Sequence, residues 1–431
     1  MLVVRSRIWM LGASAFLLAG CGGGGSITGG GGGGGGSNPN TVSINFRGTS
    51  MPQVVAAKIG SGAFAAQTLT GSSLTLTIPS GTNDYAVAFL CPTEGTAPYT
   101  SQLEFVWEAS VTDGSPLYFT CPYEPNLTLN FTGNLDGSAL PGVQSFEIFA
   151  ENGSSFGEGG VGGSATASFD MAAPTGSDRV LALAYADQGS GPVAAVNFNN
   201  QTVPGALNGG NTVAFSASDE TTAEPITYNN VPSGFGAPST YAWFGMGQTT
   251  QAFVYATDAT TQYMQLPASA TETGDVYFLD ANASGTSSQS SVNTEIVSSG
   301  GLATFTFPAP WSYSGPTAAA LPSFTMSYSG FSSDANVSEN AWIFWGTGSG
   351  GIFSTSTDDI QIQATVNYQG GSTTLAIPDL SGVSGLMAPP ASGTQVEWDA
   401  WIEQQSWGFS SPIPSNAVWN TVSNTGLYTV P

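Results

Sequence analysis

The chain has 431 residues, of which five are Lys or Arg, 29 are Asp or Glu and none is His, so its formal charge is −24 at pH 7. This charge excludes nucleic acid as a partner, because phosphate binding needs Lys and Arg to displace counterions. The absence of histidine excludes Ser-His-Asp and Cys-His catalysis and His-ligated zinc. With 41% hydrophobic residues, 57 Gly and 26 Pro, the composition favours a folded chain of many short strands.

Residues 1–20 have the pattern of an export signal. Arg5 and Arg7 precede an apolar run from Ile8 to Ala19, which is too short to span a bilayer about 30 Å thick. Removing residues 1–20 takes away both arginines and no acid. Three cations then face 29 acids, and the formal charge becomes −26.

The apolar run ends in Leu18-Ala19-Gly20-Cys21, which resembles the lipobox of bacterial lipoproteins. The resemblance implies cleavage before Cys21 and attachment of diacylglycerol to its thiol. It also implies an exported protein that is lipid-anchored to the cell envelope, with the membrane as a partner through the anchor. Gly22 stands where lipoproteins of the inner membrane often carry Asp, so we expect the outer membrane or cell surface. The alternative is an ordinary secretory signal followed by a chance cysteine.

Residues 21–40 are expected to be a flexible tether. Glycine occupies positions 22–25 and 29–36, and nothing in this segment could form a core. A Gly-rich segment of ~20 residues spans on the order of 25 Å. A folded body beyond it would be held clear of the membrane surface.

Cys91 and Cys121 are the two cysteines left after lipidation of Cys21. In an exported protein two thiols allow a single intramolecular disulfide, and we expect this pairing. Each cysteine ends an apolar segment with the character of a strand, 85–91 and 117–121. The alternative is two free buried thiols.

Internal repeats indicate four tandem units. Residues 42–48 match residues 127–133 in their alternating apolar pattern and their Asn-Phe-x-Gly exit, and residues 241–244 resemble residues 340–344. Short closing strands are predicted at 117–120, 212–215, 302–305 and 427–430. The expected units are 41–126, 127–224, 225–323 and 324–431, the last being rich in tryptophan.

Each unit holds about six or seven short strands separated by turn residues. This pattern predicts an all-β protein of tandem antiparallel β-sandwich modules, placed after the signal peptide and the Gly-rich tether. In strand number and spacing the units resemble the immunoglobulin-like and transthyretin-like modules of bacterial surface proteins. A β-propeller or β-helix is the competing architecture, but propeller blades repeat at roughly half this period.

The short motifs do not indicate an enzyme. Gly153-Ser154-Ser155-Phe156-Gly157 fits G-x-S-x-G, yet a nucleophile elbow needs a following helix and a histidine base. Lys58 would be needed for a Ser-Lys dyad, and we expect it to be a solvated strand residue. No metal site or cofactor is predicted. A calcium site between units remains an alternative, because Asp oxygens are suitable ligands, although no EF-hand loop occurs in the sequence.

Tryptophan is concentrated near the end of the chain. Period-2 alternation around Trp398 places that residue on a core face and Trp401 on the opposite face, together with Glu397, Asp399 and Glu403. Aromatic planes flanked by carboxylates are suited to sugar rings. These residues suggest the hypothesis of an exposed Trp401 that binds a ligand with the three acids, whereas the favoured interpretation is that Trp401 packs under a loop or against the third unit.

The sequence thus favours a non-enzymatic, surface-anchored lipoprotein. Its expected role is adhesion, envelope structure or the binding of a glycan or surface protein. The alternative is an exported glycan-active hydrolase that uses paired carboxylates, since 29 acids offer many pairs.

Overall fold

The computed structural model describes residues 40–47, 51–92, 100–121, 129–150, 156–159, 164–173, 179–186, 191–199, 212–246, 250–254, 261–285, 289–297, 301–327, 336–346, 356–409 and 418–431. Over these residues the predicted all-β class is confirmed, with several sheets and one short α-helix, α2 (Val366–Gln369). Three single turns are 3-10 helices: η1 (Val111–Asp113), η3 (Ala217–Asp219) and η4 (Ala268–Ala270). No helix in this part of the chain is long and apolar enough to cross a membrane.

The first unit is a β-sandwich of seven strands: β1 (Asn40–Arg47), β2 (Val54–Ile59), β3 (Ala65–Ala66), β4 (Ser73–Ile78), β5 (Asp84–Leu90), β6 (Thr100–Ser110) and β7 (Leu117–Thr120). One sheet has the order β4-β1-β7, with β1 and β7 parallel, and the other strands form a row β3-β2-β5-β6. Alternate residues of both sheets, such as Ile44 and Trp107, meet in one apolar core.

The second and third units repeat this topology. The second contains β8 (Leu129–Asp136), β9 (Ser145–Ala150), β10 (Phe156–Gly159), β11 (Thr166–Ala173), β12 (Arg179–Tyr185), β13 (Ala194–Asn199) and β14 (Thr212–Ala214). The third contains β15 (Thr222–Asn229), β16 (Ser239–Met246), β17 (Thr250–Val254), β18 (Gln262–Gln265), β19 (Val276–Ser284), β20 (Gln289–Val297) and β21 (Ala303–Thr306). In each unit the first strand pairs in parallel with the seventh and antiparallel with the fourth. The other four strands form the second sheet.

The fourth unit differs in its small sheet. Its strands are β22 (Ser312–Ser314), β23 (Ser323–Ser327), β24 (Val337–Gly346), β25 (Ser356–Thr365), β26 (Thr374–Ala376), β27 (Gln395–Gln405) and β28 (Val418–Thr429). In the other three units the seventh strand pairs with one edge of the first strand. In the fourth unit β22 occupies this edge of β23; it precedes β23 in the chain and runs antiparallel to it. The prediction of a separate closing strand at 427–430 is wrong, because Leu427 continues β28 and pairs with Glu397. An alternating pattern cannot distinguish the end of a long strand from a new short one.

Three of the units share one continuous sheet. The four-stranded rows of the third, fourth and first units join into a twelve-stranded sheet, through antiparallel pairing of β20 with β28 and parallel pairing of β25 with β6. When the strands of each unit are numbered in chain order, the row of the fourth unit runs sixth, fifth, second, third across the sheet, and the row of the first unit runs in the same order. Because β25 and β6 are parallel, each strand of the first unit's row points opposite to its counterpart in the fourth. The first unit is therefore turned over, and its small sheet packs on the opposite face of the long sheet.

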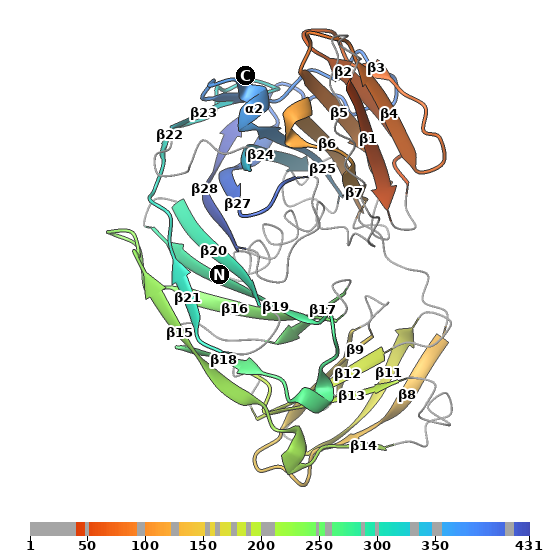
Figure 1. Cartoon of the computed structure of the whole chain (residues 1–431), viewed down its shortest axis with the longest axis vertical. Coiled ribbons are helices and arrows are strands. Elements are labelled where there is room, and N and C mark those ends of the chain that lie inside the picture. Colours follow the sequence, from red (N-terminus) through yellow and green to blue (C-terminus); the bar gives the residue numbers. More distant parts are fainter. Residues whose placement is uncertain are drawn as a thin grey trace, which may run out of the picture.

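The second unit packs against the third through an additional apolar face. Strand β12 is buried along its whole length: Val180 and Ala182 face its own core, whereas Leu181 and Leu183 join the core of the third unit. The units are thus ordered second, third, fourth, first in space, and Figure 1 shows them as an arc with the first and second at its ends. The small sheets of the third and fourth units lie on the outer side of this arc (β15, β21, β22 and β23 in Figure 1).

A buried ion pair joins the second unit to the third. The Arg179 guanidinium donates from Nη1 and Nη2 to the two carboxylate oxygens of Asp275, both at 2.7 Å, and from Nη2 to the Ala270 carbonyl at 3.0 Å. Both charged side chains are buried. Glu272, which is 61% exposed, lies 3.4 Å from the Arg179 Nε.

Lys58 lies at the contact between the first and fourth units. Its Nζ is 3.3 Å from the Glu108 Oε1 and 5.4 Å from the centroid of the Tyr368 ring, and its side chain is 18% exposed. The prediction of a solvated Lys58 is therefore wrong. On the face of β2 that the alternation leaves outside the first unit's core, Lys58 meets Tyr368 of α2 in the fourth unit.

Candidate binding face

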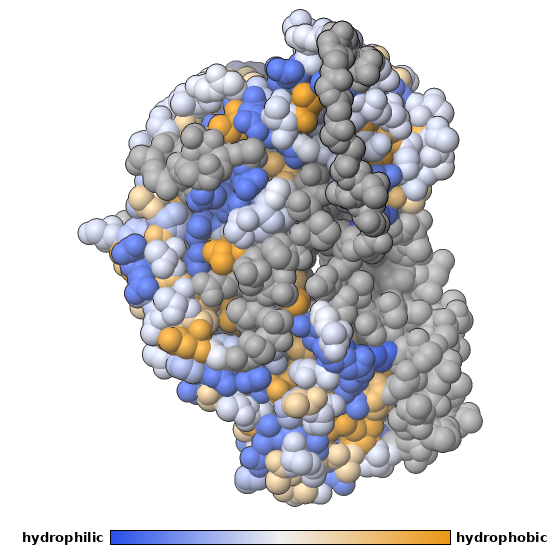
Figure 2. All heavy atoms as spheres, in the orientation of Figure 1, coloured by the Kyte–Doolittle hydropathy of each residue, from blue (hydrophilic) through white to orange (hydrophobic). Residues whose placement is uncertain are grey.

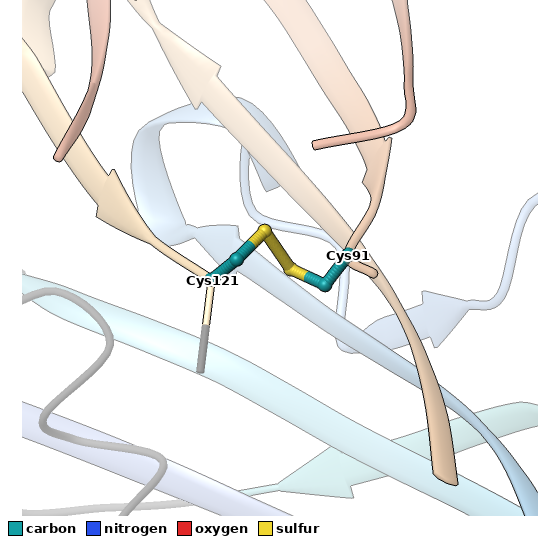
Figure 3. Close-up of a disulfide and its surroundings, with 2 residues drawn as sticks. All are labelled: Cys91 and Cys121. Carbon is teal, nitrogen blue, oxygen red and sulfur yellow. A yellow bond between two sulfur atoms is a disulfide. The ribbon is translucent and has the colours of Figure 1, made fainter. Parts of the chain in front are cut away.

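The predicted disulfide is present in the first unit. Cys91 follows β5 and Cys121 follows β7, and the two residues are bonded with their Cα atoms 5.4 Å apart (Figure 3). Both are buried, so the bond fastens the small sheet to the four-stranded row inside the core. The predicted lipidation site, Cys21, and residues 153–155 of the G-x-S-x-G match lie outside the described residues.

Strand β27 has the alternation that the sequence predicts. Trp398 is in the core of the fourth unit, where its ring centroid lies 5.0 Å from that of Tyr313 and 5.7 Å from that of Phe324. Trp401, Glu397, Asp399 and Glu403 alternate with the core residues and point to the other side of the long sheet. This side, from β16 across to β24, is turned towards the inside of the arc and is called the inner face below.

The inner face carries aromatic and polar side chains from strands β16, β19, β28, β27 and β24. Cross-strand pairs follow from the register: Asn340 lies opposite Trp401, Trp342 opposite Asp399, Gln405 opposite Trp419, Trp243 opposite Phe278, and Tyr241 opposite Asp280. Such an arrangement offers both apolar ring faces and hydrogen-bonding groups.

The hypothesis of an exposed Trp401 is wrong, and this residue is packed. Trp401 is 4% exposed, Glu397 and Glu403 are also buried, and Asp399 is half-buried. Strand β27 lies in the middle of a wide sheet, between β24 with Trp342 and β28 with Trp419, so large side chains flank it on the same face. Period-2 alternation predicts on which side of the sheet a side chain lies, but not how much of that side is covered by neighbouring side chains.

Polar groups on the inner face are bonded to one another. The Ser338 Oγ accepts from the Asn340 Nδ2 at 3.1 Å and from the Gln363 Nε2 at 3.0 Å. Burial raises the pKa of Glu403 to about 7, although a hydrogen bond from the Trp401 side chain opposes this rise. Glu403 is thus an acid that can exchange a proton near neutrality.

The inner face carries half-buried aromatic residues in the third unit, Tyr241 and Trp243, and in the fourth, including Phe344. Tyr241 and Trp243 are adjacent on β16, with ring centroids 6.2 Å apart and planes inclined by 22°. Trp243 also packs against a small apolar cluster containing Phe278 and Trp419. The sequence analysis did not single out this pair, although Tyr241 and Trp243 alternate with the core residues Ala242 and Phe244 as clearly as Trp401 does with its neighbours.

Other surfaces offer less specific chemistry. In the view of Figure 2, the hydrophobic residues that are coloured form separate small patches among hydrophilic ones. Within the described ranges no three Cys, Asp or Glu side chains gather in a way that could hold a metal ion. The inner face is therefore the described region that best combines aromatic rings, amides and carboxyl groups.

Comparison with known proteins leaves the chain without a family. No family model and no curated protein matches it. Among solved structures, the FN1–FN3 domains of chicken CNTN1 are 10% identical over 63% of this chain and 85% of that chain, with a TM-score of 0.13.

Proposed function

We propose that this protein is a non-enzymatic lipoprotein, anchored through Cys21 to the outer membrane or cell surface, that binds a neutral glycan on its inner face. The observation that carries the anchoring is the order of features in the first 40 residues: a basic start, an apolar run, the lipobox and a glycine tether. The body that follows the tether is a set of interlocked β-sandwiches, which suits a rigid carrier of a binding site.

The inner face supports a glycan as the ligand. Aromatic rings pack on the C–H faces of sugars, and amides and carboxyl groups bond to hydroxyls. The three cations of the described residues are all engaged with other side chains: Lys58 and Arg179 form the ion pairs described above, and the guanidinium of the half-buried Arg47 lies 3.5 Å from the Tyr118 ring centroid. A chain of this charge repels anionic polymers, so the proposed glycan is neutral.

Replacing Cys21 by serine is expected to abolish lipid attachment, because serine has no thiol to carry diacylglycerol. The protein should then accumulate uncleaved or be released from the envelope. Metabolic labelling with a palmitate analogue, followed by fractionation of the cells, measures both effects. Label that persists in Cys21→Ser would contradict the anchoring.

Replacing Trp243 by alanine is expected to weaken glycan binding by about tenfold or more, since it removes a ring from the half-buried Tyr241–Trp243 pair. Because Trp243 is only half-buried, the melting temperature should change little. A glycan array followed by calorimetry on the hit tests this. Leu302→Ala, which alters a 62% exposed side chain in the same unit, is the matched control and should bind like the wild type.

The same assay separates the proposal from its alternatives. Selective binding of acidic glycans, or of none, would contradict a neutral-glycan site while leaving the anchoring intact. Release of cleaved sugar that is lost in Glu397→Gln or Asp399→Asn would instead support the hydrolase alternative, in which two carboxyl groups act as a pair.

A further inference from the structure

The joint between the first and fourth units is built largely from carboxyl groups. The Asp113 carboxylate accepts hydrogen bonds from the Thr365 Oγ1 and the Asn367 Nδ2, both at 2.6 Å. The Glu108 Oε1 accepts from the Tyr368 hydroxyl at 3.0 Å and lies 3.3 Å from the Lys58 Nζ. These contacts lie beside the parallel ladder of β6 and β25.

Two further carboxyl groups are buried away from any described cation, one inside this joint and the other one strand away from it. Glu104 on β6 is 1% exposed, and its Oε2 accepts from the Met387 backbone N–H at 2.7 Å. Glu339 on β24 is also 1% exposed, and its Oε2 has no hydrogen-bond partner. Glu339 and Glu108 lie on the same side of the sheet, separated by Ala364 of β25, which pairs with both. Helix α2 contacts all three of these strands and covers them.

Acids outnumber cations throughout this joint. The titratable groups that face it from the elements packed there are Lys58, Asp84, Glu104, Glu108, Asp113, Glu339, Asp358 and Tyr368. Lys58 is the sole cation among these groups in the described ranges, and it is paired with Glu108. Ionisation of the remaining buried acids would therefore place like charges in a weakly solvated interface without a counterion.

We propose that the joint between the first and fourth units is a proton-dependent lock, which is tight when Glu104 and Glu339 are protonated and loosens when they ionise. Such a device would let an envelope protein change the rigidity of its body with the external pH. It does not depend on the proposed glycan ligand.

The electrostatics give the direction and the pH range. Burial raises the pKa of Glu104 to about 7, with the bond from Met387 opposing the rise, and burial raises the pKa of Glu339 to about 7. When the joint opens, these groups return to an ordinary carboxyl pKa near 4.5. The closed joint then holds more protons than the open one between these values. Its stability is therefore full below pH 4.5 and is lost as the pH rises through about 7.

Hydrogen exchange on the purified protein at pH 5 and pH 8 tests the proposal. After correction for intrinsic exchange, the opening constant of the amides in β6, β25 and α2 should rise on the order of 10²-fold for each group whose pKa differs in this way. Amides of β19 in the third unit serve as the internal reference. In the double variant Glu104→Gln and Glu339→Gln, which keeps the side-chain shapes but cannot ionise, most of this rise should disappear.

Asp379→Asn is the matched control, because this carboxyl is exposed and its hydrogen bond to Ser381 lowers its pKa below the tested range. It should respond to pH like the wild type. Equal protection of β6 and β25 at both pH values in the wild type would overturn the proposal, and so would a full pH response in the double variant. If the double variant fails to fold, the wild-type comparison alone still decides.

Discussion

Replacing Asp275 by alanine is expected to lower the free energy of unfolding by about 3–5 kcal/mol, because it leaves the Arg179 guanidinium buried without its bidentate partner. Asp275 also accepts from the Glu272 backbone N–H at 2.6 Å, so the turn before β19 loses a contact as well. Urea unfolding followed by tryptophan fluorescence measures the change. The joint between the second and third units should be the first to open.

Two further variants test the physical reason. Glu272→Ala removes the exposed member of the same cluster and should change stability by less than about 1 kcal/mol, because exposed ion pairs contribute little. The double variant Arg179→Met and Asp275→Leu replaces both charges by apolar groups and should recover much of the loss. If Asp275→Ala were as stable as Glu272→Ala, the buried pair would not be holding the two units together.

Replacing Trp398 by alanine is expected to cost about 3–5 kcal/mol, since a large ring is removed from the core of the fourth unit. The site is closely fitted to this ring: a Cβ on Gly426 of the neighbouring strand would lie 2.7 Å from Trp398 Cζ2. Trp401→Ala should be destabilising to a similar extent, because Trp401 is buried too and its side chain bonds to Glu403. Thermal unfolding of both variants checks the pair.

The comparison decides the role of Trp401. An unchanged melting temperature in Trp401→Ala, beside a large loss in Trp398→Ala, would contradict its burial and restore the idea of an exposed platform at that position. Phe324→Leu is a suitable control, since it keeps an apolar side chain next to Trp398 and should be milder than removal of the indole.

Much of the fold follows from local sequence patterns. Alternation of apolar residues locates most strands, the Asn-Phe-x-Gly repeat marks two equivalent first strands, and two remaining thiols fix the disulfide between Cys91 and Cys121. These features depend on residues close in sequence or on simple counting. The same alternation assigned Trp398 and Trp401 to the correct sides of β27.

The association of the units could not be read in this way. Pairing of β25 with β6 joins residues more than 250 positions apart, and the edge residues carry no mark of their partner. For the second unit the sequence does carry a signal: residues 180–185 are all apolar or aromatic, which indicates a strand buried on both faces and hence a second packing surface. The hypothesis of an exposed Trp401 and the prediction of a solvated Lys58 are wrong for the same reason, since the burial of each side chain depends on neighbours from another part of the chain.

The shared sheet has a mechanical consequence. In the proposed arrangement the glycine-rich segment connects the lipid anchor to β1 of the first unit, whereas the proposed binding pair, Tyr241 and Trp243, lies on β16 of the third. A pull between anchor and ligand would be borne by the backbone ladders between β6 and β25 and between β28 and β20, rather than by a pliant connection between beads. Many peptide hydrogen bonds would then share the load, so that the first, fourth and third units would resist extension together.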